Sequence, residues 1–549
     1  MTPAPDSPRS PDLPHGVPDA LLGEYAPFGN VALDDTERWP TLTPDGAARL
    51  DALRHHPAAP VWVHATGDRL TADDLPVLAA TARRFAERAA ERERDGTGDA
   101  GGTDDDRTGP GAEAGHPATA HPVPAWVTDL VERAHAVVPR YRRARDQRRS
   151  HARSPLDALP PVTRDDLRAD LASFVPVDVD LSRIIEGTSS GSTGAAVVVP
   201  LHPVAVAADL ALLHLLVRDA GATWTPHEDR LGLVNLVDQR AAFTYASAMT
   251  GFDAASGRAT SDLSAPLMAR VNLDPGAWRD PADRSTFLRG TDPQVLSSSP
   301  LPLLALADLD AREGLGLHPV AVVSGAAHLT PPARARLRAA WDVPVIDLYG
   351  LRETGAVASR ADDGPFVVAP RRVWVEILSD DGTPVPDGSP GEVVVTTDEN
   401  PYLPLLRYRT GDRARIVRPR GPGGRVELHD LEGRSPVRYR HADGRWLGSV
   451  DATQVLQAAG IAAWQLHQRA DGTIELTVVP DAPAGGAPSG RGPGRAGAPG
   501  TGAAPATDSA ARALRQWIGR DVVVTVTTPA RLGHGRARRY SSDVPGGQA

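Results

Sequence analysis

The chain has 549 residues, a formal net charge of −10 and a mean hydropathy of −0.28. This length exceeds what one hydrophobic core supports, so we expect at least two domains. The acidic balance argues against nucleic-acid binding, and no apolar run has the length of a membrane span. The first residues lack the charged-then-apolar pattern of a secretory signal, which favours a cytoplasmic protein.

Two residue types are missing from the sequence. There is no cysteine, which excludes disulfides, thiol nucleophiles and cysteine-ligated zinc. There is also no lysine, so all 59 basic residues are arginines. Coding bias in a GC-rich genome explains this composition most simply. Its chemical consequence is that any step needing a lysine ammonium must use another group.

Two low-complexity segments interrupt the chain. Residues 91–121 are polar, acidic and rich in glycine, and residues 481–506 are mostly Ala, Gly, Pro, Ser and Arg. Neither segment can bury enough apolar surface to offset its ordering entropy, so both are predicted to be surface insertions or linkers. We therefore expect an N-terminal extension at 1–125, a core with a nucleotide site at 126–434 and a small mobile C-terminal domain at 435–549.

The core alternates between strand and helix patterns. A β-branched run at 196–200 predicts a strand, and an apolar-periodic stretch at 202–220 predicts a long helix. The runs RLGLVNLV, QVLSSS, PVAVVSG and PVIDLYG predict further strands, separated by the helical patterns LPLLALADL and PPARARLRAA. The fold class is therefore α/β, with a large N-terminal body of parallel sheets covered by helices. Extended runs from 371 onward predict a β-rich subdomain, and the residues after 434 predict a small α+β C-terminal domain.

Three segments contain residues suited to nucleotide chemistry. TSSGSTG (188–194) has glycines and hydroxyls that leave backbone N–H groups free for an anion. DLYGLRETG (347–355) follows a predicted parallel strand and offers a ring to stack on a base and a carboxylate for magnesium. LLRYRTGDR (405–413) has a carboxylate that could accept hydrogen bonds from a ribose diol. Each segment alone also fits a surface turn, a capped helix start or an Arg–Asp pair.

Two further segments complete the pattern. Gly433–Arg434 lies where the body is predicted to end, and the basic tail RLGHGRARRY spans 531–540. Alone, they fit a polar turn and a solvated charged end. The order of all five segments resembles the adenylate-forming superfamily of acyl-CoA synthetases, peptide-synthetase adenylation domains and luciferases. The forms TSSGSTG and LPLLRYRTGD, with the upstream stretch LPPVTRDDLR, resemble the phenylacetate-CoA ligase-like branch. This resemblance covers about 126–540.

The resemblance implies a reaction and a set of roles. In this superfamily a substrate acid attacks the α-phosphate of MgATP, pyrophosphate leaves, and a nucleophile such as coenzyme A then displaces AMP. Implied groups for the β- and γ-phosphates are Thr188, Ser189, Ser190, Gly191, Ser192, Thr193 and Gly194. Adenine is expected beside Tyr349 and Gly350, with Gly325, Ala326 and Ala327 on its other side. The implied catalytic residues are Glu353 (also the magnesium ligand), Thr354 at the α-phosphate, Arg434 at the hinge and Arg536, with Asp412 at the ribose.

Three departures from the family pattern affect these expectations. The usual lysine after the phosphate loop is replaced by Ala195 and Ala196. The usual C-terminal lysine is missing from GHGRARR, so His534, Arg536 or Arg538 would have to substitute. The usual hinge acid is replaced by Ser435 and Pro436, and this proline could restrict the domain rotation between adenylation and transfer.

The substrate site is expected to be polar. Its predicted residues are Asn235, Asp238, Arg240, Tyr245 and Ser324. Arg240 could pair with an acid group, or Asp238 with an amine, which predicts a polar or small substrate. The alternative is that residues 238–240 cap a helix and face solvent.

Three functions remain open on these observations. The first is an AMP-forming ligase, of acid–thiol or acid–amine type, that uses ATP and Mg²⁺ and passes its acyl group to CoA, a carrier-protein thiol or an amine in bacterial specialised metabolism. The second is a related enzyme that activates an oxyanion such as nitrite for diazo or N–N bond formation. The third is a nucleotide-binding homologue without catalysis, which the missing lysines favour and the retained Glu353, Asp412 and Arg434 disfavour. In each case the partner is a small molecule, with no nucleic acid and no membrane.

Overall fold

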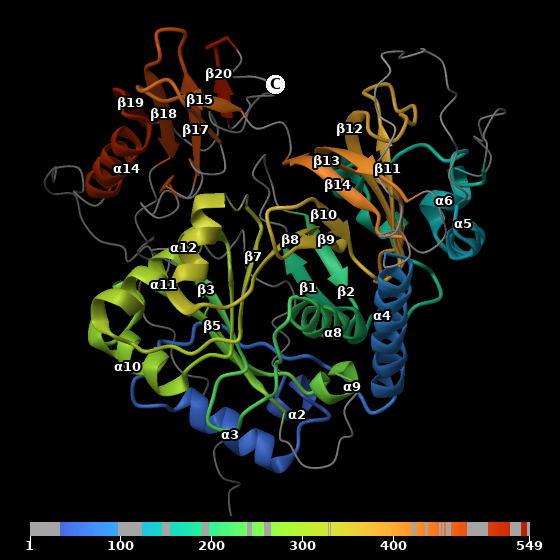
Figure 1. Ribbon diagram of the computed structural model, residues 1–549, viewed down its shortest axis with the longest axis horizontal. Coiled ribbons are helices and arrows are strands. Elements are labelled where there is room, and N and C mark those ends of the chain that lie inside the picture. The colour runs from blue at the N-terminus through green and yellow to red at the C-terminus, as the bar shows by residue number, and fades with distance from the viewer. Residues whose placement is uncertain are drawn as a thin grey trace, which may run out of the picture.

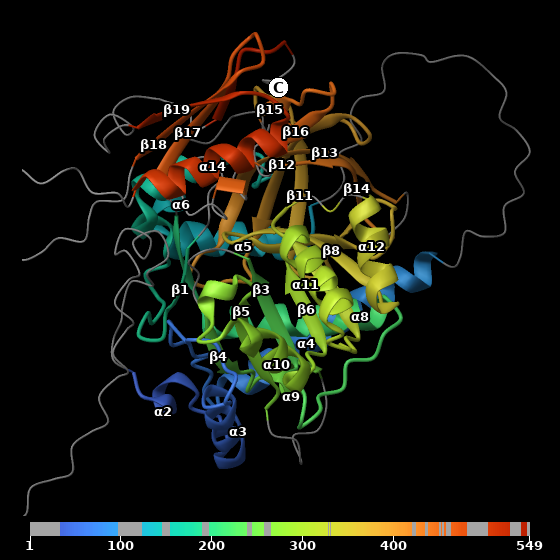
Figure 2. The ribbon, with the colours of Figure 1, turned by 90° about the vertical axis from the view of Figure 1, so that its left-hand side faces the viewer.

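The computed structural model describes residues 33–96, 123–144, 154–188, 197–238, 244–256, 265–327, 329, 331–419, 424–433, 437–448, 452, 455–456, 463–479, 503–526 and 540–545. A twelve-stranded mixed sheet forms the body of the molecule, and a four-stranded sheet forms the core of a C-terminal lobe. Figures 1 and 2 show this lobe, with its helix α14 (Ala503–Ile518), above the body in both views.

The parallel half of the large sheet positions the predicted substrate residues. Its strands are β3 (Leu233–Val237), β5 (Leu267–Asn272), β6 (Val295–Ser298), β7 (Ala321–Gly325) and β8 (Val345–Leu351). They lie in the order β8-β7-β6-β3-β5, and β4 (Tyr245–Ala248) closes the edge by pairing antiparallel with β5. The predicted parallel sheet is confirmed for this half of the body.

The other half of the sheet is antiparallel. Its strands are β9 (Gly355–Arg360), β10 (Phe366–Val368), β11 (Val373–Leu378), β12 (Pro390–Thr397), β13 (Leu405–Val417) and β14 (Glu427–Glu432). The sequence predicted a β-rich subdomain here. The β-rich character is confirmed, and these strands continue the parallel sheet because β8 also pairs with β9 in an antiparallel hairpin. A separate hairpin, β1 (Ile185–Thr188) with β2 (Val198–Leu201), flanks the predicted phosphate loop.

Helices cover both faces of the parallel half, as the alternation of patterns predicted. One face packs against α4 (Asp74–Gly96), α8 (Pro203–Asp219) and α9 (Phe252–Ser256), which lie side by side in Figure 1. The opposite face packs against α3 (Pro44–Arg54), α10 (Pro281–Thr291), α11 (Pro300–Glu313) and α12 (Pro331–Trp341). Proline begins α8, α10 and α11, where its missing N–H costs no helical hydrogen bond.

The described part of the N-terminal segment belongs to the same cores as the body. It forms α2 (Asp35–Arg38), α3 and α4; Trp39 and Leu50 pack with one face of the sheet, and Phe85 with the other. Helix α4 continues to Gly96, so the first residues of the predicted insertion at 91–121 are helical. The next segment forms α5 (Ala125–Val137), α6 (Pro139–Ala144), α7 (Arg164–Ala169) and η2 (Leu171–Phe174), packed against β13. A short η3 (Pro275–Ala277) precedes α10.

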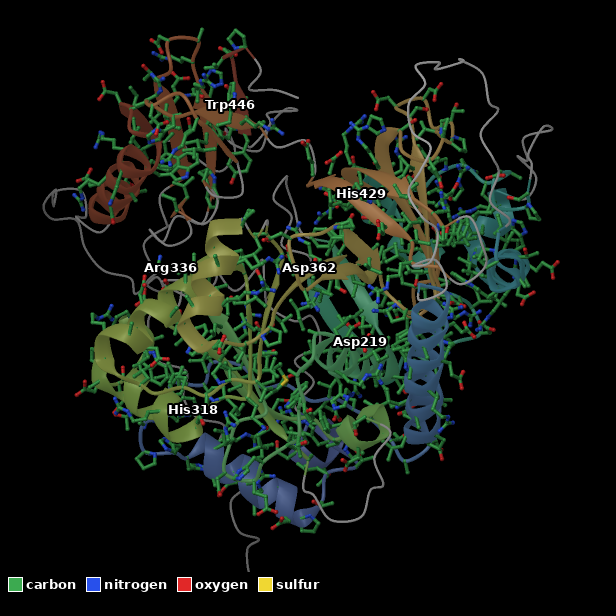
Figure 3. The ribbon with its side chains drawn as sticks, viewed as in Figure 1. Asp219, His318, Arg336, Asp362, His429 and Trp446 are labelled. Carbon is green, nitrogen blue, oxygen red and sulfur yellow. The ribbon has the colours of Figure 1, made fainter. Side chains whose placement is uncertain are left out.

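The C-terminal lobe has a hydrophobic core of its own, around Tyr439, Trp464 and Leu514. Its sheet has the order β19 (Val522–Val526), β18 (Ile474–Val479), β17 (Ala463–Gln468), β20 (Tyr540–Ser542), beside the hairpin β15 (Arg438–Arg440) and β16 (Trp446–Gly448). Trp446 in this lobe and His429 on β14 lie in different parts of the molecule in Figure 3. The small α+β C-terminal domain is confirmed, although α14 begins at Ala503, inside the predicted insertion. None of the described helices is both long and apolar enough to cross a bilayer.

Candidate active site

The segment DLYG ends the strand β8 at the centre of the sheet. Gly350 is required there, because a Cβ at this position would lie 2.6 Å from the carbonyl oxygen of Gly355 on β9. The pairing of the two strands shifts register between Tyr349 and Gly350. This close approach brings Tyr349 to the point where the parallel and antiparallel halves of the sheet meet.

A chain of contacts holds the Tyr349 ring. The Tyr349 and Phe366 rings meet in a T-shaped arrangement with centroids 6.4 Å apart, and the Arg360 guanidinium lies 4.4 Å over the Phe366 ring. Arg360 in turn donates to Asp347 from Nη2 and Nε, at 3.0 and 3.1 Å. Asp347, the first residue of the motif, is therefore a buried anchor for this chain of contacts.

Tyr349 also contacts the TGD motif. Its hydroxyl donates a 2.9 Å hydrogen bond to Oδ2 of Asp412 on β13, which is only 7% exposed. The Asp412 backbone N–H donates to Oγ1 of Thr410 at 3.0 Å, which defines the local turn. Two residues that lie 63 positions apart, one in each motif, thus form a direct side-chain pair.

The acidic residue of the YGxxETG pattern lies in the same place. Glu353 is 3% exposed, and its Oε1 accepts a hydrogen bond from the hydroxyl of the fully buried Tyr408, at 3.3 Å. Thr354 is also buried, and its hydroxyl donates to the Gly355 carbonyl at 3.1 Å. Gly355 follows with a φ of +68°, in the left-handed region that favours glycine. The predicted Glu353, Thr354, Tyr349 and Asp412 therefore converge.

The residues present fit a magnesium ion shared with phosphates. Within the described ranges, no three His, Cys, Asp or Glu side chains gather into a metal cluster, and no arginine forms an ion pair with Glu353. Mg²⁺ commonly takes one or two protein carboxylates and fills its shell with water and substrate phosphate oxygens. A single buried carboxylate such as Glu353 is compatible with that mode of binding.

The predicted adenine segment lies on the neighbouring strand. Gly325 at the end of β7 pairs with Leu348 of β8, which places Gly325, Ala326 and Ala327 beside Tyr349. Ala326 is exposed and has a φ of +62°, an uncommon backbone for a residue with a Cβ. Ser324, just before this turn, is fully buried, and its hydroxyl has no hydrogen-bond partner among the described residues.

The described members of the predicted substrate site lie at three places on the sheet. Asn235 on β3 and Tyr245 on β4 both pair with Arg270 of β5, so they share one face of the sheet. Asp238 lies just beyond β3 and contacts solvent. Desolvation by the surrounding protein and the nearby Asp274 raise the pKa of its carboxyl. On β7, Val323 pairs with Ser297 of β6, so the next residue, Ser324, lies on the opposite face of the sheet. Ser324 is fully buried there.

Several predicted residues lie outside the described ranges. Thr188 ends β1, but the rest of the phosphate loop is not described. The residues concerned are Ser189, Ser190, Gly191, Ser192, Thr193, Gly194, Ala195 and Ala196, with Arg240, Arg434, Ser435, Pro436, His534, Arg536 and Arg538. Their roles stay predictions.

Three residues near these groups were not predicted. Tyr408 stands in the YRTGD motif itself, four residues before Asp412, and its place in that motif was the available signal. Arg270 and His64 had no such signal. Arg270 is one polar residue in the strand LMARVN, and His64 precedes every motif by more than a hundred residues.

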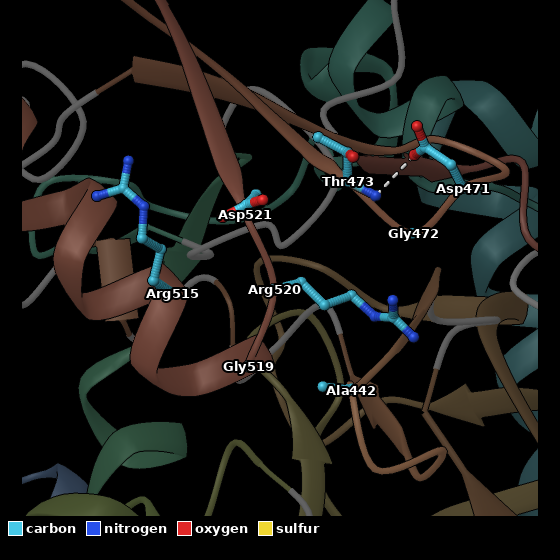
Figure 4. A pocket seen from close by; sticks show the side chains of 8 residues that line it. All are labelled: Ala442, Asp471, Gly472, Thr473, Arg515, Gly519, Arg520 and Asp521. Carbon is cyan, nitrogen blue, oxygen red and sulfur yellow. Dashed lines mark hydrogen bonds between the residues drawn. The ribbon is translucent and has the colours of Figure 1, made fainter.

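A pocket in the C-terminal lobe lies apart from all these residues. It has a volume of about 460 Å³ and is lined by Ala442, Asp471, Gly472, Thr473, Arg515, Gly519, Arg520 and Asp521 (Figure 4). Its two arginines already bond to backbone carbonyls: Arg520 Nε to Arg440 at 2.8 Å, and Arg515 Nη2 to Val522 at 3.1 Å. The pocket contains no predicted site residue.

Comparison with known proteins locates the family resemblance. The family of AMP-binding enzymes matches residues 163–400. The phenylacetate-coenzyme A ligase of Aromatoleum evansii is 33% identical over 136 residues, which cover 23% of this chain and 31% of that enzyme. The Pseudomonas putida enzyme of the same name is 29% identical over 140 residues, covering 24% and 32%. The chain thus aligns with about a third of the length of these relatives.

Solved structures of CoA ligases also align with the chain. A 2-hydroxyisobutyryl-CoA ligase in complex with 2-HIB-AMP is 18% identical, with a TM-score of 0.45, over 76% of this chain and 88% of that one. The family match over 163–400 includes the β8–β9 turn with Tyr349 and Glu353, and the aligned relatives are named phenylacetate-coenzyme A ligases. Residues 163–400 of this chain are therefore similar to the family of AMP-binding enzymes.

Proposed function

We propose that this protein uses ATP to convert a carboxylic acid into an acyl-adenylate, with release of pyrophosphate, and then transfers the acyl group to coenzyme A. The observation that carries the proposal is the convergence of Tyr349, Asp412, Glu353 and Tyr408, from two distant motifs, at one point of the sheet. The names of the aligned relatives support CoA as the acceptor.

The first step needs no covalent contribution from the protein. A carboxylate oxygen of the substrate attacks the α-phosphorus of ATP, and the bond from that phosphorus to the pyrophosphate oxygen breaks. Such a step depends on positioning and on neutralising charge. Glu353 is buried beside a neutral hydroxyl, so its carboxylate is available for a magnesium ion that would offset phosphate charge.

The described side chains have separate roles in this proposal. The Tyr349 ring, held by Phe366, offers one flat face to adenine. The Asp412 carboxylate accepts one hydrogen bond from the Tyr349 hydroxyl, at Oδ2. The remaining lone pairs of its two oxygens can accept hydrogen bonds from the two ribose hydroxyls. The Thr354 hydroxyl can turn from its own backbone toward the α-phosphate, since its present acceptor is the neighbouring Gly355 carbonyl.

The charge usually supplied by lysine must come from another residue in this chain. Arg536 is the proposed substitute in the tail, with His534 and Arg538 as the other choices. Arginine retains its charge at all working pH values, but its planar head forms a fork of donors rather than a compact point charge. We therefore propose that the adenylation step tolerates the exchange because a guanidinium can hold two oxygens at once.

The test is pyrophosphate and AMP release from ATP and Mg²⁺ with a panel of aliphatic, aromatic and amino acids plus nitrite, each with and without CoA. We expect pyrophosphate release that depends on the acid. We expect AMP release and a thioester only when CoA is present. Pyrophosphate release with nitrite and with none of the acids would mean that the substrate is an inorganic oxyanion rather than a carboxylic acid. ATP binding without pyrophosphate release for any compound would overturn the proposal in favour of a non-catalytic homologue.

A further inference from the structure

Four polar residues form one row across the parallel half of the sheet. Tyr245 on β4 pairs with Arg270 on β5, Arg270 pairs with Asn235 on β3, and Asn235 pairs with Ser297 on β6. Residues that pair directly across neighbouring strands point to the same face. All four are partly exposed, whereas their immediate neighbours along each strand, such as Leu236, Val271 and Leu296, are buried on the opposite face.

On this same face, the residues change from apolar to polar along the strands. Two residues earlier lie Leu233, Met268 and Val295, which belong to or pack against the hydrophobic core formed with α4, α8 and α9. The polar row begins where this apolar cover ends, toward the carboxyl ends of the parallel strands. That edge is where open α/β sheets bind their ligands. The row is therefore a surface that the helices leave uncovered, next to the strands of the nucleotide site.

Arg270 is the charged member of the row. Its Nε atom is buried, and within the part of the chain that the structure describes, no hydrogen bond and no carboxylate reaches its guanidinium. By contrast Arg284 and Arg230, which approach the same sheet from the helices and loops, both have acidic partners: Glu313 and Asp292. A partly buried guanidinium without a partner is costly, which points to an anion supplied from outside.

The N-terminal segment adds a histidine to this surface. The His64 ring meets the Tyr245 ring edge-on at 6.1 Å, and the backbone N–H of His64 donates to the Thr244 carbonyl at 3.1 Å. Burial, and then the positive charges of Arg38 and Arg270, lower the pKa of His64. His64 is therefore neutral at neutral pH, and Arg270 supplies the positive charge of the row.

We propose that Arg270, with Tyr245 and Asn235, binds a second carboxylate of the substrate, so that the enzyme activates a dicarboxylic acid at one end while holding it at the other. A guanidinium binds a carboxylate through two parallel N–H···O bonds, and tyrosine and asparagine can donate to the remaining lone pairs. This inference rests on the proposed acid-activating function, whose reaction takes place at the first carboxylate.

The strand order limits the substrate size. From β5, which holds Arg270, to β7, which ends in the predicted adenine segment, there are three strand spacings, about 14 Å. A substrate that reaches from Arg270 toward that segment needs several carbon atoms between its two carboxylates. Nitrite is too small to reach both ends, so the row favours an organic acid.

The experiment compares matched acids that differ by one carboxylate: adipic with hexanoic acid, and 4-carboxyphenylacetic with phenylacetic acid. Pyrophosphate release is measured for the wild type and for Arg270→Met, Arg270→Lys and Arg289→Met. Arg289 lies exposed on α10, on the opposite side of the sheet, and serves as the matched control. We expect a diacid preference in kcat/KM of at least about tenfold in the wild type. Arg270→Met should remove it by raising KM for the diacid, Arg270→Lys should retain part of it, and Arg289→Met should keep it.

A stability measurement tests the same inference without catalysis. Because the guanidinium has no partner in the described structure, Arg270→Met should leave the melting temperature unchanged or raise it, and adipate should raise the melting temperature of the wild type but not of the variant. A wild type that turns over the monoacids at least as well as the diacids would overturn the inference and leave the proposed function intact. Loss of folding in Arg270→Met would also overturn it, since that result assigns the arginine a structural partner. No pyrophosphate with any acid would instead contradict the proposed function.

Discussion

The two proposed sites on the large sheet differ in kind. Where the parallel and antiparallel halves meet, Tyr349, Asp412, Glu353 and Tyr408 are mostly buried and form two hydrogen-bonded pairs, so their positions are set before any ligand arrives. On the parallel side the row around Arg270 is partly exposed, and its charge is not paired within the described residues. A preorganised set of side chains suits a nucleotide, which is the same in every reaction. A partly exposed row with an unpaired charge suits a substrate that supplies the opposite charge when it binds. The following predictions test this contrast.

The largest effect is expected at Glu353. Glu353→Gln keeps the shape and the Tyr408 contact but removes the negative charge, so magnesium-dependent pyrophosphate release should fall on the order of 100-fold. The melting temperature should change little, because the amide oxygen still accepts the hydroxyl. Glu432→Gln, an exposed carboxylate at the end of β14, is the matched control. Wild-type turnover in Glu353→Gln would remove Glu353 from the mechanism and with it the central observation of the proposed function.

Gly350 tests whether the nucleotide side is rigid. A methyl group there would lie 2.6 Å from the Gly355 carbonyl oxygen, so Gly350→Ala must push β8 and β9 apart. We expect a loss of roughly 2 kcal/mol in unfolding free energy, together with weaker ATP binding. Chemical denaturation and ATP titration measure the two effects. Gly364→Ala is a control, because its nearest neighbour is the Asp362 side chain rather than backbone. If both variants behave alike, the nucleotide side is more adaptable than its contacts indicate.

The Tyr349–Asp412 pair should have a smaller effect. Tyr349→Phe keeps the ring against Phe366 but removes one hydrogen bond, which is worth about 1 kcal/mol. We therefore expect KM for ATP to rise about fivefold, with kcat little changed. Tyr402→Phe also removes one hydroxyl hydrogen bond, to the Asp180 carbonyl, and should leave KM for ATP unchanged. An equal rise in both variants would mean that lost stability, and not nucleotide binding, is being measured.

The smallest effect concerns pH, at a buried carboxyl on the far edge of the parallel half. Burial raises the pKa of Asp68 to about 6, although Thr250 and the Leu70 N–H donate to it. The folded state therefore binds a proton that the unfolded state releases near pH 3.8. The resulting stabilisation is full below that pH and is lost as pH rises through 6, so it falls by about 1 kcal/mol between pH 5 and pH 7.

Asp68→Asn removes this titration. The unfolding free energy of the variant relative to the wild type should rise by about 1 kcal/mol from pH 5 to pH 7, and any constant offset from altered hydrogen bonds cancels in that comparison. Histidines with lowered pKa values act in the opposite direction in both proteins and cancel as well. The exposed Asp45→Asn is the control. A parallel pH dependence in Asp68→Asn and wild type would contradict the raised pKa.

Local sequence determined much of this protein. Hydrophobic periodicity predicted the helix α8 and the parallel strands, because burial on one or both faces leaves a repeating pattern in any chain. Short motifs with glycine, hydroxyl and acidic residues predicted Tyr349, Glu353 and Asp412, since tight turns beside an anion need those residue types within a few positions.

Other features were decided only by the tertiary structure. The antiparallel strands join the parallel ones through the β8–β9 hairpin, and no periodicity states which strands become neighbours. Arg270 was not predicted, because a polar residue in a strand does not show which face it joins until the register with β3 and β4 is set. His64 reaches the same row from about 180 residues away along the chain, through backbone hydrogen bonds to Thr244. Pairing between distant segments depends on the packing of the whole core, and a local pattern of residues does not contain that information.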